Sequence, residues 1–113
     1  MTIQEYETYV QNSMSPKYDD KLAMLGLLGE VGEVADVLKK NIIYADMSKF
    51  EAKYGMSVKD KVKDEMGDIL YQYCVLAAQF QLTIDDIIEY NVEKLNARHG
   101  GAGKTAVDGG GVR

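Results

Sequence analysis

Apolar residues recur at helical spacing along most of the chain, and no stretch alternates strictly between apolar and polar residues as a half-buried strand would. The only proline is Pro16, so little interrupts this helical pattern. The sequence therefore predicts an all-α protein. We expect a helical bundle of about four helices, of which two are long and antiparallel.

Capping residues and helix breakers place these helices along the chain. Thr2, Ser57 and Thr83 are suitable N-caps, and Lys39 and Lys40 would complement the dipole of a helix that ends there. The expected helical segments are 2–12, 20–40, a short one at 48–53 within a connection, 58–81 and 84–98. Residues 1–99 are expected to form a single domain, and the Gly-rich segment 100–113 a disordered tail.

Each long helix carries apolar residues that we expect to face the core. On the first they are Leu22, Leu25, Leu28, Val31, Val34, Ala35 and Leu38. On the second they are Val62, Met66, Ile69, Leu70, Tyr73, Leu76, Ala77 and Phe80. The single cysteine, Cys74, lies in an apolar run and is predicted to be a buried structural thiol.

Charge and length exclude several classes of function. The 113 residues carry 13 basic and 18 acidic side chains, a net charge of −5, which argues against a general nucleic-acid binder. No apolar run reaches the roughly 18 residues that span a bilayer, and the N-terminus lacks a signal-like core, so we expect a cytoplasmic protein without a membrane partner. A chain of this size would also gain from burying more apolar surface by oligomerisation.

Two acidic pairs lie inside the predicted long helices. Glu30 and Glu33 form one pair, and Glu65 and Asp68 form the other. Residues three apart share a helix face, so two facing helices would bring four carboxylates to one point. Such a cluster needs a cation, and oxygen ligands suit Mg²⁺ first and Mn²⁺ second. The simpler alternative is two exposed faces with surface ion pairs, such as Lys61 with Glu65.

The repeated glycines and the polar face of the last helix each allow a structural and a functional interpretation. Gly26, Gly29 and Gly32 repeat within one helix, which indicates either close helix packing or room for a metal ion and phosphates. Asn91, Lys94 and Arg98 share one face of the last helix, where they could hold phosphate oxygens or, for the basic pair, simply favour the helix C-terminus.

Three blocks of sequence together resemble a known family. They are Gly29-Glu30-Val-Gly-Glu33-Val-Ala-Asp36, Asp64-Glu65-Met-Gly-Asp68-Ile-Leu and Asn91-Val-Glu-Lys94-Leu-Asn-Ala-Arg98, and over about residues 20–98 they resemble the MazG-like all-α nucleoside triphosphate pyrophosphohydrolases. The resemblance implies a helical bundle that forms a homodimer or homotetramer and binds Mg²⁺. Its ligands would be Glu30, Glu33, Glu65 and Asp68, while Asn91, Lys94 and Arg98 would contact substrate phosphates.

The expected activity is therefore Mg²⁺-dependent hydrolysis of a nucleoside triphosphate between its α and β phosphates, giving monophosphate and pyrophosphate. Glu33 is the candidate base, and Tyr71 and Tyr44 are candidates for stacking on the nucleobase. Alternatives are a hydrolase of a signalling nucleotide and a helical interaction module without enzymatic activity. A ferritin-like di-iron bundle ranks last, because no histidine precedes His99.

Overall fold

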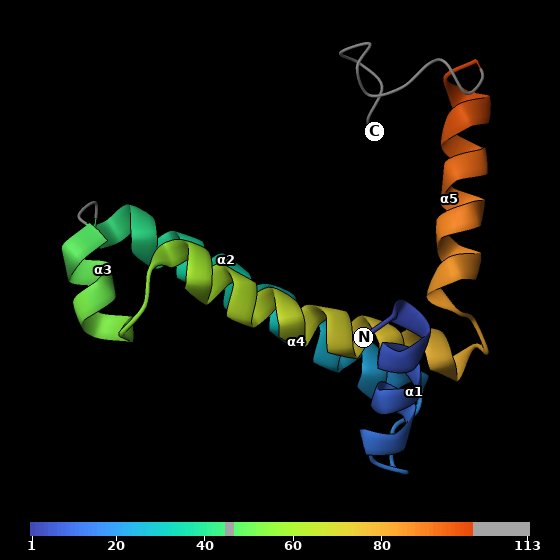
Figure 1. The fold of residues 1–113 in the computed structure, drawn as a ribbon. Helices are drawn as coiled ribbons and strands as arrows, with labels where there is room; N and C mark the ends of the chain where they lie inside the picture. Colours follow the sequence, from blue (N-terminus) through green and yellow to red (C-terminus); the bar gives the residue numbers. More distant parts are fainter. Residues whose placement is uncertain (45–46, 101–113) are drawn as a thin grey trace. The chain divides into compact units, whose positions relative to one another are not determined.

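The computed structural model describes residues 1–44 and 47–100, and within them it contains helices but no strand. The helices are α1 (Ile3–Ser13), α2 (Asp20–Tyr44), α3 (Met47–Tyr54), α4 (Val58–Gln79) and α5 (Ile84–Arg98) (Figure 1). The prediction of an all-α protein is confirmed. The chain divides into two compact units, Met1–Gln81 and Leu82–Arg113, which we describe separately. The predicted tail lies largely outside the described residues.

Three predicted N-caps are confirmed. The side-chain oxygens of Thr2, Ser57 and Thr83 each accept a hydrogen bond of 3.1 Å from a backbone amide three residues further on. The carboxylates of Glu5 and Asp86 in turn accept hydrogen bonds from the backbone amides of Thr2 and Thr83, which completes two capping boxes. These caps depend on near neighbours in the chain, which is why the sequence located these helix starts closely.

The two long helices end elsewhere than predicted. α2 continues to Tyr44, so Lys39 and Lys40 do not lie in its last turn, and that prediction is wrong. No glycine or proline follows Lys40 to stop the helix, and the Lys40 ammonium pairs with Asp36 at 3.2 Å instead. α4 ends two residues early, at Gln79, because Gln81 adopts the left-handed backbone conformation with φ of 55°.

In the first unit, α2 and α4 lie side by side and run antiparallel (Figure 1). α1 packs against α4, and α3 packs against both long helices. The buried apolar residues are Val10, Ala23, Val37, Phe50, Cys74, Val75 and Ala77. Cys74 is thus buried, as predicted, and burial raises the pKa of its thiol, which opposes a role as a nucleophile.

The apolar stripe predicted to face the core on α2 instead remains largely on the surface of the chain. Leu25 is 65% exposed and Leu28 is 60% exposed, and Leu22, Val31 and Leu38 are also exposed. The reason is that α2 carries apolar residues around most of its circumference, and smaller residues such as Ala23 allow its other side to approach α4. On α4, Met66, Leu70, Tyr73 and Phe80 are likewise exposed, contrary to prediction.

Along the described residues, no helix combines the length and apolarity that crossing a membrane requires.

Candidate functional site

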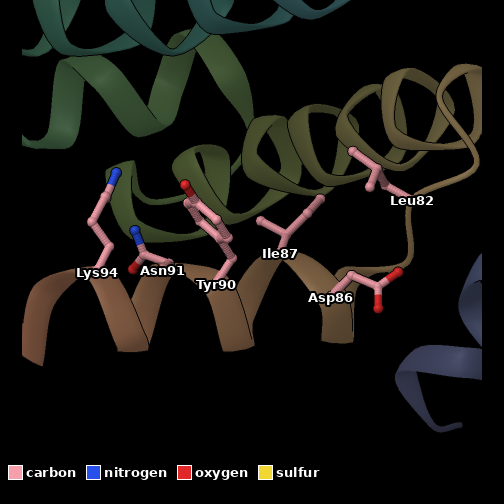
Figure 2. A pocket seen from close by; sticks show the side chains of 6 residues that line it. All are labelled: Leu82, Asp86, Ile87, Tyr90, Asn91 and Lys94. Atoms are coloured by element: carbon pink, nitrogen blue, oxygen red, sulfur yellow. The ribbon is translucent and has the colours of Figure 1, made fainter.

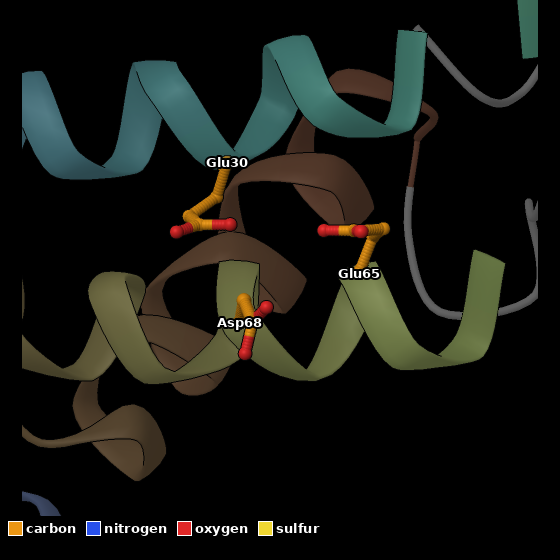
Figure 3. A group of neighbouring side chains, drawn as sticks. All are labelled: Glu30, Glu65 and Asp68. Carbon is orange, nitrogen blue, oxygen red and sulfur yellow. The ribbon is translucent and has the colours of Figure 1, made fainter. Parts of the chain in front are cut away.

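Three of the four predicted acidic ligands converge between α2 and α4. Glu30 extends from α2, and Glu65 and Asp68 extend from α4; each offers a carboxylate oxygen within 4.8 Å of the other two (Figure 3). We call these three residues the acid cluster. Glu65 is only 8% exposed, Glu30 is half-buried and Asp68 is exposed. The antiparallel pairing of two helices therefore creates a concentrated negative charge that is open to solvent on one side.

Glu33 lies outside this cluster. It is exposed and follows Glu30 by one helical turn on α2. Burial is the largest cause that raises the pKa of Glu30, and the negative charges of Asp68, Glu65 and Glu33 raise it further. The charge of Glu33 therefore acts on Glu30, although only the other three acids meet. A divalent cation would relieve this repulsion.

Lys61 offers partial compensation for the acid cluster. Its ammonium lies 3.1 Å from Glu65 and 3.5 Å from Asp64, so the ion pair expected under the simpler alternative is present. Glu65 is nevertheless the one buried charged side chain among the described residues, whereas that alternative predicts an exposed face. One ammonium facing three clustered carboxylates leaves an excess of negative charge. The all-oxygen set fits a hard cation such as Mg²⁺ or Mn²⁺.

Only one of the mid-helix glycines in α2 is explained by close contact within the chain. A Cβ placed on Gly26 would lie 2.6 Å from Oε1 of Gln72, whereas Gly29 and Gly32 face open space. Close helix packing therefore accounts for Gly26 alone. No sequence pattern indicated Gln72, because its contact with Gly26 depends on how α2 and α4 are aligned.

The second unit carries the predicted phosphate-binding residues on α5. Asn91 and Lys94 project from one side of the helix and line a pocket together with Leu82, Asp86, Ile87 and Tyr90 (Figure 2). Arg98 is exposed one turn beyond Lys94 and does not line this pocket. Tyr90, which is 71% exposed, was missed by sequence analysis, although its position beside Asn91 places it near the predicted residues.

Tyr71 lies half-buried on α4, where its hydroxyl is engaged with α1. The hydroxyl oxygen lies 2.8 Å from Oγ of Ser13, at hydrogen-bond distance. This bond ties α1 to the helix that carries Glu65 and Asp68. The side chain of Tyr44, the other tyrosine considered for base stacking, lies outside what the structure describes.

An all-helical chain in which two antiparallel helices bring carboxylates together has the features of a carboxylate-based metal enzyme. Comparison with protein-family models makes the assignment specific. Residues 19–101 match the MazG nucleotide pyrophosphohydrolase domain. The chain belongs to this family, as the three sequence blocks indicated, and the family defines its class of activity as nucleotide pyrophosphohydrolase. Neither the curated proteins nor the solved structures provided a match.

Proposed function

We propose that the protein hydrolyses a nucleoside triphosphate between its α and β phosphates and releases a monophosphate and pyrophosphate. The observation that carries this proposal is the convergence of Glu30, Glu65 and Asp68 within a chain that belongs to the MazG family. A polyphosphate repels a protein of net charge −5 unless cations accompany it. The acid cluster supplies ligands for such cations.

Glu30, Glu65 and Asp68 would hold the metal ion, with Mg²⁺ the first candidate. When bound, Mg²⁺ neutralises charge on the phosphates and makes the phosphorus more electrophilic. Glu33 is exposed and one turn from Glu30, so we assign it to the attacking water. Its carboxylate would orient the water and accept its proton while the water oxygen bonds to phosphorus. The bridging bond between the α and β phosphates then breaks, and pyrophosphate leaves.

The pocket on α5 supports a role in substrate binding. Asn91 offers amide donors and Lys94 offers an ammonium on one side of the helix, which suits phosphate oxygens (Figure 2). Arg98 adds a guanidinium one turn further along α5. The exposed ring of Tyr90 lies next to Asn91, so it is a further candidate, beside Tyr71, for contact with the nucleobase.

The exposed apolar face of α2 supports assembly into a homodimer or homotetramer. Leu22, Leu25, Leu28 and Val31 form a large unburied apolar surface, and such surfaces in a small protein usually mark an interaction site. The same surface favours the second candidate function, an interaction module without enzymatic activity. We place the protein in the cytoplasm, because nucleoside triphosphates are abundant there and the lone thiol of Cys74 suits a reducing compartment.

One experiment separates the two functions. The purified chain is incubated with Mg²⁺ and a panel of ribo- and deoxynucleoside triphosphates, and the products are identified by chromatography, with Glu65→Ala alongside. Monophosphate and pyrophosphate, lost in the variant, are expected. Diphosphate with phosphate would contradict the assigned bond. No turnover, together with a melting temperature that Mg²⁺ and nucleotide leave unchanged, would favour the interaction module.

A further inference from the structure

Gln72 carries a buried side-chain oxygen that no donor among the described residues satisfies. This Oε1 lies between α2 and α4, where a Cβ on Gly26 would come within 2.6 Å of it. An amide oxygen that loses water without gaining a donor costs free energy, so buried polar groups in native proteins nearly always have partners. The described residues therefore leave this oxygen without a donor, which a bound water molecule could supply.

The position of Gln72 connects it with the acid cluster. Gln72 follows Asp68 by four residues on α4, and Gly26 precedes Glu30 by four residues on α2. Because α2 and α4 run antiparallel, the contact between Gln72 and Gly26 lies one helical turn from the acid cluster. The missing side chain at Gly26 provides the space that the Gln72 amide occupies.

The charged side chains of the acid cluster and Lys61 do not supply the donor. Ionised Glu30 and Asp68 only accept hydrogen bonds. Lys61 lies on the opposite side of the cluster, one turn before Glu65, and its ammonium is engaged with Glu65 and Asp64. A hydrated divalent cation, in contrast, keeps several water molecules whose O–H groups point outward as donors.

We propose that Gln72 is a positioning residue of the metal centre, whose Oε1 accepts a hydrogen bond from a water molecule in the hydration shell of the cation. The inference rests on the proposed function, since it requires a cation at Glu30, Glu65 and Asp68. Outer-shell partners of this kind orient the ion and its waters, and their loss typically lowers metal affinity about 10- to 100-fold.

The test measures metal binding without substrate. The full chain and Gln72→Met are titrated with Mn²⁺, and the unbound ion is measured by electron paramagnetic resonance. Gln72→Met is expected to weaken Mn²⁺ binding about 10- to 100-fold. Its melting temperature in EDTA should be unchanged or higher, because methionine fills similar space without an unsatisfied oxygen. Gln72→Glu, which keeps acceptor oxygens at the same length, should retain Mn²⁺ binding.

Gln79→Met is the matched control, since Gln79 lies two turns further along α4, and its Mn²⁺ affinity should equal that of the unaltered chain. Equal affinity in Gln72→Met would overturn the inference while leaving the proposed hydrolysis intact. A lower melting temperature in EDTA with unchanged affinity would also overturn it, by showing that Gln72 only holds α2 against α4. If the unaltered chain binds no Mn²⁺ and hydrolyses no triphosphate, the proposed function and this inference fail together.

Discussion

The ammonium of Lys61 lies 3.1 Å from the carboxylate of Glu65, one helical turn away on α4. Glu65 is also a member of the acid cluster, so the same carboxylate faces both an internal cation and the candidate site of a metal ion. Lys61 therefore stabilises the metal-free protein and would compete with a bound metal ion for Glu65. This double role makes the pair a sensitive test of the site.

Lys61→Met should lower the stability of the metal-free protein and increase the effect of Mg²⁺ on it. Without the ammonium, the buried Glu65 carboxylate loses its partner, which should cost about 1–3 kcal/mol. The remaining charge should then attract Mg²⁺ more strongly. Thermal unfolding in EDTA and in Mg²⁺ measures both effects. Lys63→Met, at a side chain that is 80% exposed, is the control and should change little. A smaller Mg²⁺ effect in Lys61→Met would mean that Lys61 helps to hold the ion.

Two glycines in α2 should respond in opposite ways to alanine. Gly32 faces open space, so Gly32→Ala should raise the free energy of unfolding by up to about 1 kcal/mol through helix propensity. Gly26→Ala should lower it, because the new Cβ would lie 2.6 Å from Oε1 and 2.9 Å from Cδ of Gln72. Urea denaturation in EDTA measures both. Stabilisation by Gly26→Ala would show that Gln72 moves aside without cost.

Features that depend on nearby residues were predictable from the sequence, whereas the packing of α2 was not. The caps at Thr2, Ser57 and Thr83 were predictable because each depends on residues within one helical turn. The meeting of Glu30 with Glu65 and Asp68 was predictable once two long helices were expected to pair. The sequence did not predict which face of α2 would be buried. Apolar residues surround that helix, and their spacing fits more than one packing face.

The positions of Gln72 and Glu33 relative to the acid cluster could likewise not be predicted from the sequence. Contact of Gln72 with Gly26 depends on the axial alignment of α2 and α4, which no local signal sets. Glu33 shares a motif with Glu30, but it remains exposed outside the acid cluster. A three-residue spacing places two side chains on one broad face without requiring that both reach the same point.

Glu30 should make the stability of the metal-free protein depend on pH. Its pKa is raised above the ordinary value of 4.5, chiefly by burial, so the folded state binds its proton more tightly than the unfolded state does. Stability should therefore fall as the pH rises from 4.5 through the raised pKa. Glu30→Gln cannot ionise and should lose this dependence. Melting temperatures of both proteins in EDTA, from about pH 4 to about pH 8, should diverge with increasing pH. A constant difference would contradict this electrostatic assignment.

The apolar face of α2 should control assembly. Leu28 is 60% exposed, and a charge placed there would have to be buried in any interface that uses this face. Leu28→Glu should therefore shift the protein to monomers in analytical ultracentrifugation while retaining its helical circular dichroism. Lys39→Glu, at an exposed polar position of the same helix, is the control. An unaltered chain that is itself monomeric would contradict the proposed homo-oligomer.

Glu33→Gln should separate chemistry from binding. The amide keeps the size of the side chain but cannot accept a proton from water, so turnover should fall about 10²- to 10⁴-fold. Affinity for Mg²⁺ and triphosphate should change little, because Glu33 lies outside the acid cluster. Product formation gives turnover, and calorimetry with a nonhydrolysable triphosphate gives affinity. Glu51→Gln, at an exposed carboxylate of α3, is the control and should match the unaltered protein in both. Equal loss of affinity and turnover in Glu33→Gln would instead identify Glu33 as a metal ligand, drawn into the acid cluster when the cation binds.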